Sequence, residues 1–228
     1  ERIFSYTQWK YVFGQLGTRD QEQLTSSFAR VLERQGVEVT NIFEELDRIY
    51  LQCSDKFDEA VLSLVQNVNR KKTAKSHSKQ TILLEELELN YDVLNEVYHY
   101  LQRWLTIAEN LLERISTSQL ESSHSEKLIV AEWQYWLNEM KIKTGEWVDI
   151  FLSSTSEHSV WIELDRRSVP GSLHVYKKPI DSTWAVKEIF DEWRGKAGII
   201  WTSGTLSVPG NSRFIVNQLG LPENVQIK

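Results

Sequence analysis

The sequence predicts a mainly α protein, an elongated antiparallel helical bundle followed by a small α/β tail. Apolar residues recur at helical spacing through most of residues 5–152, and one such run is much longer than an ordinary helix. Strand-like alternation begins after residue 153. We therefore expect a helical domain over 1–157 and an α/β segment over 158–228.

The longest helical run has apolar residues at alternating spacings of three and four, as in a coiled coil. Its members are Leu84, Leu87, Tyr91, Leu94, Tyr98, Leu101, Leu105, Ala108, Leu112 and Ile115. At about 1.5 Å per residue such a helix is roughly 50 Å long, too long to be covered by short elements. It therefore requires partner helices of similar length.

Two other segments have the same periodicity. The first consists of Ile42, Leu46, Ile49, Cys53, Phe57, Ala60, Leu64 and Val68, with Thr40 or Asn41 as the expected N-cap. The second consists of Ile129, Trp133, Trp136, Met140, Trp147 and Ile150, interrupted by Lys143. Tryptophans at these positions are expected in the core. A shorter helix around Phe28 should end near Gly36.

Polar segments at 70–79 and 116–126 are expected to be loops between the long helices. In the tail, residues 160–165 and 173–181 read as strands, and Pro170-Gly171 between them is a turn signal. An amphipathic helix is expected over 183–194, followed by a strand that runs into the sequence TSGTL and by a helix ending at Gly220. This alternation is typical of α/β segments.

The tail has an ordered set of sequence landmarks. KKPID is followed by a helix ending in EIFDEWRGK, by GIIWTSGTLS, by a Pro-Gly loop and by QLGLP. Over about 45 residues this order resembles the DinG and XPD group of superfamily 2 DNA helicases, in which TSGTL is helicase motif III. The resemblance implies that the preceding helices are the arch domain inserted into the first RecA-like lobe, and that the small α/β tail is part of that lobe. Because it has no iron-sulfur cysteine set, the chain resembles the Gram-positive DinG proteins. Those proteins often carry a DnaQ-like 3'-5' exonuclease domain.

The resemblance also implies roles for residues and partners. Motif III, which would couple ATP hydrolysis to DNA movement, comprises Thr202, Ser203, Gly204 and Thr205. ATP and Mg²⁺ would bind the parent protein, with single-stranded DNA and the remaining helicase lobes of the same polypeptide as partners. In a RecA-like lobe, hydroxyl and amide donors at a strand end approach the nucleotide cleft. The alternative is that the motif is only a turn at the end of a strand.

The chain by itself offers no catalytic residues for ATP hydrolysis. Its Gly195-Lys196 pair is followed by Ala197, where a Walker A loop needs Ser or Thr. The DEAV sequence at 58–61 lies within an amphipathic helix and ends in Val, unlike a DEAH box. Because Walker A and B are both missing, we expect the chain alone to bind no cofactor and to be inactive.

A basic run between two long helices is a candidate DNA-binding segment. Its basic residues are Arg70, Lys71, Lys72, Lys75 and Lys79. Such cations can hold the phosphates of single-stranded DNA. The alternative is a solvated loop, which is favoured because no aromatic residue is interleaved with the lysines for base stacking.

Composition limits the remaining function classes. The net charge of −6 gives no global attraction to polyanions, and the single Cys53 allows neither a disulfide framework nor a cysteine-based metal cage. No histidine pair has metal-site spacing, and no apolar run is long enough to cross a membrane. The N-terminal sequence suggests a piece of a longer chain. The single cysteine suggests a reducing, cytoplasmic setting. The rival hypothesis is a non-enzymatic adaptor, whose heptad seams recruit a partner helix.

Overall fold

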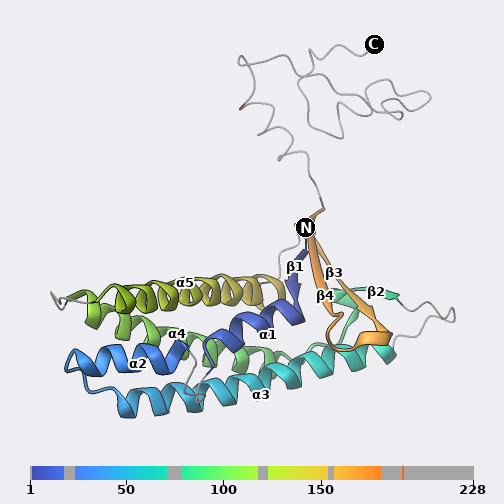
Figure 1. The fold of residues 1–228 in the computed structure, drawn as a ribbon. Coiled ribbons are helices and arrows are strands. Elements are labelled where there is room, and N and C mark those ends of the chain that lie inside the picture. Colours follow the sequence, from blue (N-terminus) through green and yellow to red (C-terminus); the bar gives the residue numbers. More distant parts are fainter. Residues whose placement is uncertain are drawn as a thin grey trace, which may run out of the picture. The chain divides into compact units, whose positions relative to one another are not determined.

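The computed structural model describes residues 2–17, 24–70, 79–117, 123–153, 157–180 and 192. Its helices are α1 (Tyr6–Gln15), α2 (Leu24–Arg34), α3 (Thr40–Arg70), α4 (Tyr91–Thr117) and α5 (His124–Trp147). A short π-helical segment, Val148–Leu152, continues α5. Figure 1 shows α3, α4 and α5 side by side in alternating directions. The mainly α fold class is therefore confirmed.

The chain divides into two compact units. The first comprises Glu1–Thr155 with Val160–Lys177, and the second comprises Ser156–Ser159 with Lys178–Lys228. Most of the second unit lies outside the described residues, including the helices and the strand expected after residue 182, of which Glu192 alone is described. Apart from residues 158–159 and 178–179, the helices and strands described below belong to the first unit.

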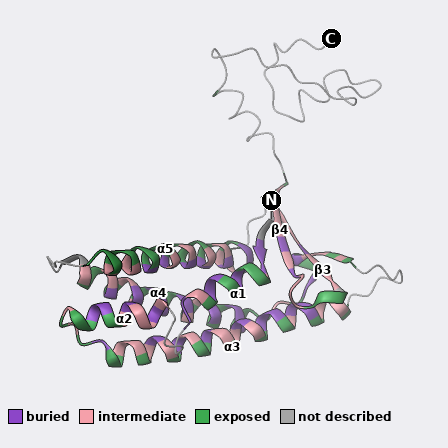
Figure 2. Ribbon diagram, viewed as in Figure 1, coloured by how far each residue is buried: buried purple, intermediate pink, exposed green. Residues whose placement is uncertain are grey.

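The buried faces of the helices are those that the periodicity predicts. On α3 every seam residue except Ile42 is buried, and Ile42 packs at the edge of the same core. On α5 the tryptophans at 133 and 147 and Met140 are buried, while Trp136 is half-buried. Figure 2 shows the buried residues of the helices turned toward one another. No helix among the described residues is long and apolar enough to cross a membrane.

The predicted start of the longest helical run, at Leu84, is wrong. The helix begins at Tyr91, and the residues before it form a 3₁₀ turn, Leu84–Glu86, followed by an extended Leu87. Leu84 and Leu87 are nevertheless buried, because the apolar repeat continues through a segment that covers the same core. The backbone N–H of Val93 donates to Oδ1 of Asn90 at 3.4 Å, so Asn90 acts as the N-cap.

Capping at the other helix ends follows the sequence with one small difference. The first residue of α3 is Thr40, and the N–H groups of Ile42 and Phe43 donate to the carbonyl of Val39. Neither Thr40 nor Asn41 is therefore the N-cap, which lies one residue earlier. After α2, Gly36 has φ +74 and the Val37 N–H donates to the Leu32 carbonyl, which confirms the glycine-terminated end.

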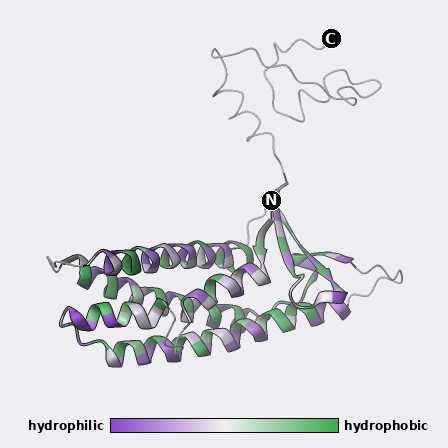
Figure 3. Cartoon of the chain, viewed as in Figure 1, coloured by the Kyte–Doolittle hydropathy of each residue, from purple (hydrophilic) through white to green (hydrophobic). Residues whose placement is uncertain are grey.

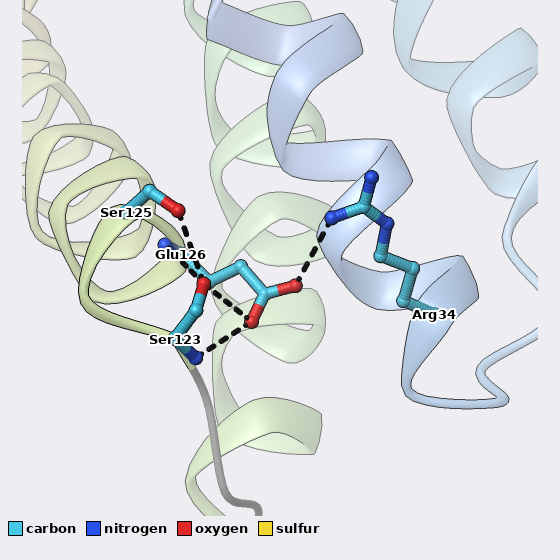
Figure 4. A network of polar contacts seen from close by, with 4 residues as sticks. All are labelled: Arg34, Ser123, Ser125 and Glu126. Carbon is cyan, nitrogen blue, oxygen red and sulfur yellow. Dashed lines mark hydrogen bonds and ion pairs between the residues drawn. The ribbon is translucent and has the colours of Figure 1, made fainter.

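The start of α5 is fixed by a capping box that also contacts α2 (Figure 4). The Ser123 hydroxyl accepts from the Glu126 N–H at 3.3 Å, and Glu126 Oε2 accepts from the Ser123 N–H at 2.9 Å. The other oxygen of Glu126 accepts from Arg34 at 3.4 Å. The Arg34–Glu126 ion pair thus connects the last turn of α2 to the first turn of α5.

The strands form one sheet of order β1-β4-β3-β2. The strands are β1 (Arg2–Ser5), β2 (Lys79–Leu83), β3 (His158–Asp165) and β4 (His174–Pro179). The two tail strands are confirmed, whereas β1 and β2 were not predicted. The sheet joins strands from both sides of the predicted boundary at 157/158, and that boundary stays a prediction.

An aromatic cluster joins the sheet to the helices. The Trp147 ring lies 6.2 Å from Phe4 of β1, 5.5 Å from Phe57 of α3 and 4.6 Å from Phe151, measured between ring centroids. Its Nε1 donates to the Leu94 carbonyl of α4 at 3.1 Å. Trp147 therefore contacts β1 of the sheet as well as α3 and α4 of the helical bundle.

Candidate nucleic-acid interface

Most of the residues predicted to be functional lie outside the described residues. These are the motif III residues at 202–205 and the lysines at 71, 72 and 75. Their roles remain predictions. Of the basic run, the structure places Arg70 and Lys79, which lie at its two ends.

Arg70 and Lys79 are both exposed where regular structure meets the 71–78 segment. Arg70 is the last residue of α3, where a cation is favoured by the partial negative charge of the helix C-terminus. Lys79 is the first residue of β2 and is paired in register with Asp165 of β3. The end of the β2–β3 pair is thus the point at which the basic run enters the sheet.

A second cation, not predicted from the sequence, lies at the same end of the sheet. Arg167 is in the 3₁₀ turn Arg166–Ser168 that follows β3. Its backbone N–H donates to Oδ1 of Asp165 at 3.0 Å, and its guanidinium contacts both carboxylate oxygens at 3.3 and 3.2 Å. The Arg167 side chain remains 76% exposed. It can therefore still bind an external anion.

The charge of Asp165 is partly compensated in this arrangement. The hydrogen bonds from the Arg167 side chain and backbone hold the pKa of the Asp165 carboxyl below its usual value, and the charge of Lys79 acts in the same direction. The same contacts raise the pKa of the Arg167 guanidinium. Asp165 thus stays ionised at neutral pH and orients Arg167, while Lys79 and Arg167 leave this end of the sheet cationic.

Aromatic side chains share a face of the sheet with these charges. Side chains alternate between the two faces of a strand, and Ile162 and Leu164 of β3 are buried in the core. Trp161, Glu163 and Asp165 therefore lie on the outer face. The register pairs Trp161 with Leu83 and Asp165 with Lys79.

The outer face carries a stacked aromatic pair. The rings of Trp161 and Tyr176, on the neighbouring strands β3 and β4, lie 5.4 Å apart with an interplanar angle of 9°. Both residues are half-buried, and Nε1 of Trp161 donates to Oε1 of Glu163 at 3.4 Å. Trp161 is four residues from Asp165, about 13 Å along an extended strand. The aromatic residues that the basic run lacks are thus supplied by the sheet.

This face has the two properties that single-stranded nucleic acid requires. Cations at its end can contact phosphates, and the solvent-accessible parts of the half-buried Trp161 and Tyr176 rings can contact bases. Glu163 lies between the cationic end and the aromatic pair, so the surface is mixed in charge. Sequence reasoning missed Trp161, Tyr176 and Arg167, although the outward positions of the two predicted strands already marked the aromatic residues.

The DEAV segment lies in the middle of α3, where Glu59 is exposed and Asp58 half-buried, whereas Ala60 and Val61 are buried in the core. Its Asp58 accepts from Nζ of Lys10 at 2.8 Å and from the Tyr6 hydroxyl at 3.3 Å, so its contacts hold α1 against α3. Within the described ranges no group of three or more His, Cys, Asp or Glu side chains could hold a metal ion.

Comparisons with known proteins give one informative result. No family model and no solved structure matches the chain. The chain is similar to the 3'-5' exonuclease DinG of Bacillus subtilis (strain 168), with 21% identity over 226 residues that cover 96% of this chain and 24% of the relative. It therefore spans about a quarter of the relative's length. This similarity supports a DinG-like relationship along most of the chain.

Proposed function

We propose that the chain is the helical arch-type insertion and the returning RecA-like segment of a DinG-like, ATP-dependent DNA helicase. The similarity to a DinG protein extends over both parts of the chain, and the tail has the order of landmarks that surrounds motif III in that group. The insertion guides single-stranded DNA. Motif III, at 202–205, couples ATP hydrolysis in the parent protein to movement of that DNA.

The contact with DNA is assigned to the outer face of the sheet. The observation that carries this proposal is the β2–β3 register, which sets Lys79 beside Asp165 and Leu83 beside Trp161. This register brings the entry of the basic run, Arg167 and the Trp161–Tyr176 stack onto one surface. Phosphates contact the cationic end, and a base contacts the aromatic pair.

The parent protein supplies what this chain lacks. ATP and Mg²⁺ bind between the remaining helicase lobes, and a DnaQ-like exonuclease domain, as in the Gram-positive type, is a further part of the proposal. The setting is the cytoplasm. The 228-residue chain alone should show no DNA-stimulated ATPase activity, since it has no Walker A or B sequence.

The DNA contact is tested by fluorescence anisotropy with a labelled single-stranded oligothymidylate. Trp161→Ala should weaken binding by roughly 5- to 150-fold, the usual range for loss of one stacked base, whereas Trp161→Phe should retain most of the affinity. The double variant Lys79→Gln, Arg167→Gln should reduce the slope of log affinity against log salt concentration by about 1.4, because each lost phosphate contact on a single strand contributes about 0.7.

Matched controls distinguish this face from general charge and aromatic content. Arg48 of α3 has a 59% exposed side chain and Tyr91 of α4 is 56% exposed, and both lie outside the proposed surface. Arg48→Gln and Tyr91→Ala should leave the affinity unchanged. Equal losses in the controls and in the sheet-face variants would refute the assignment, as would wild-type binding without dependence on Trp161 or Lys79.

A second candidate function is the adaptor hypothesis, and it is favoured by an observation on α5. That helix has large apolar residues on its solvent-facing side as well as in the core. An adaptor would bind a partner helix there and would show no affinity for single-stranded DNA. The anisotropy experiment therefore separates the two functions.

A further inference from the structure

α5 carries two heptad-spaced stripes on opposite faces. The inner stripe consists of Trp133, Met140 and Trp147, which are 0%, 1% and 0% exposed. The outer stripe consists of Leu128, Tyr135 and Ile142, which are 58%, 55% and 54% exposed. Figure 2 shows exposed residues along the whole of α5, and Figure 3 shows hydrophobic residues recurring along the same helix. A regularly spaced apolar stripe that faces solvent indicates a binding surface.

The outer stripe has the geometry of a coiled-coil seam. If Leu128, Tyr135 and Ile142 are the a positions of a heptad, the d positions are Ala131, Asn138 and Gly145, all of them exposed. A Cβ atom built on Gly145 meets no heavy atom within 4 Å, and Gly145 also lines a cavity with Leu105 and Glu109 of α4. Small residues at d allow a second helix to approach closely.

The centre of the seam is held in place by neighbouring rings. Tyr135 packs edge-on against Trp136 with ring centroids 5.0 Å apart, and Trp136 packs edge-on against Tyr11 of α1 at 5.7 Å. These contacts restrict the Tyr135 side chain before any partner binds. Less side-chain entropy is then lost on association.

The charges beside the seam select the orientation of a partner with the same sequence. The e positions are Glu132, Glu139 and Glu146, and the g positions are Lys127, Gln134 and Lys141. In a parallel pair, g of one helix faces e of the next heptad on the other, which sets Lys127 against Glu132. The corresponding residues Lys141 and Glu146 already form ion pairs within the chain, with Glu109 of α4 and with Lys143. An antiparallel pair would instead bring lysine to lysine and glutamate to glutamate.

We propose that the outer seam of α5 binds the same seam of a second copy of this chain as a parallel two-stranded coiled coil. The charge pattern is self-complementary in that orientation, and the apolar a positions of the two copies then cover one another. Lys127 and Glu132 are both exposed and form no ion pair among the described residues, so they are available for the partner. This inference does not depend on the proposed DNA contact.

Sedimentation equilibrium of the 228-residue chain tests the association. The wild-type chain should show a mass twice the 26.7 kDa of one chain at micromolar concentration. Leu128→Glu together with Ile142→Glu should give the single-chain mass with unchanged helical circular dichroism. Leu62→Glu is the matched control, because Leu62 is a 50% exposed leucine on α3, and it should remain dimeric.

Charge exchange tests the orientation. Lys127→Glu should raise the dimer dissociation constant on the order of tenfold, because two symmetrical attractive pairs become repulsive. Adding Glu132→Lys to the same chain should restore the wild-type constant. Recovery in the double variant is expected of a parallel self-pair, whereas a different partner helix would not follow the exchange.

A cysteine placed at a d position gives an independent measure. Equivalent d residues face one another in a parallel pair, so Ala131→Cys should form a disulfide between chains under mild oxidation. Cys53 is buried and contributes no background. A wild-type chain that stays monomeric at 100-fold higher concentration, failure of the double exchange, or lack of crosslinking at 131 would overturn the proposal.

Discussion

Trp147→Phe should destabilise the fold by about 2–3 kcal/mol. The substitution removes the Nε1 donor to the Leu94 carbonyl, and a hydrogen bond of this kind contributes about 1 kcal/mol. It also shortens a side chain that is 0% exposed, which loses burial equivalent to about two methylene groups at ~0.8 kcal/mol each. The cost should approach the upper value, because Phe4, Phe57 and Phe151 surround the ring and resist collapse into the space.

Urea unfolding followed by far-ultraviolet circular dichroism measures this loss. With an m value of roughly 2–3 kcal/mol/M, the midpoint should fall by about 1 M at unchanged m. Tyr91→Phe is the control, because Tyr91 is 56% exposed and its variant should remain within about 0.5 kcal/mol of wild type. A Trp147→Phe midpoint that moves no more than that of the control would refute the role assigned to this side chain.

Other measurements follow from the cap, the buried thiol and the cationic end of the sheet. Ser123→Ala should cost about 1 kcal/mol in urea unfolding. Hydrogen bonds from Ser123 lower the pKa of the Glu126 carboxyl in the folded protein. The ionised carboxylate therefore stabilises the fold above the ordinary carboxyl pKa, and this stabilisation is lost as the pH falls through the lowered pKa of the folded state. The difference in unfolding free energy between wild type and Glu126→Gln should therefore shrink below about pH 4. Burial raises the pKa of the Cys53 thiol to about 12, so an aromatic disulfide reagent should react with it only in denaturant, and rapid native labelling would contradict its burial. Asp165→Asn keeps an acceptor for the Arg167 N–H and removes one negative charge, so single-stranded DNA should bind several-fold more tightly; weaker binding would refute the electrostatic assignment.

The helices could be predicted because the spacing of their apolar residues shows which face of each helix is buried in the core. The seam of α3 and the inner stripe of α5 were found from spacing alone, since a three-four repeat fits only one face of a helix. The same rule failed at Leu84 and Leu87, which enter the core from a 3₁₀ turn and an extended residue. The start of a helix depends on its capping residue, which for α4 is Asn90. The apolar repeat continues upstream of Asn90, so the repeat alone does not mark the helix start.

The sheet was harder to predict because its pairing is not local. β1 has four residues and β2 has five, and each becomes a strand through hydrogen bonds to β4 or β3, far away in the sequence. The surface on the sheet depends on that pairing. A search along the chain for aromatic residues among the lysines of 70–79 could not find Trp161, because only the register brings the two segments together.

The two proposed surfaces have the same structural origin. Trp147 and Phe4 fix the sheet to the helices from the inside, so the outer face of the sheet remains available to polar and aromatic residues. The core-facing side of α5 is filled by Trp133, Met140 and Trp147, which are buried. The exposed apolar residues at 128, 135 and 142 are therefore not needed to fill the core of the monomer. An element that already buries a complete inner stripe has no folding requirement for a second one. Its outer stripe is best explained by association, as the outer face of the sheet is by ligand contact.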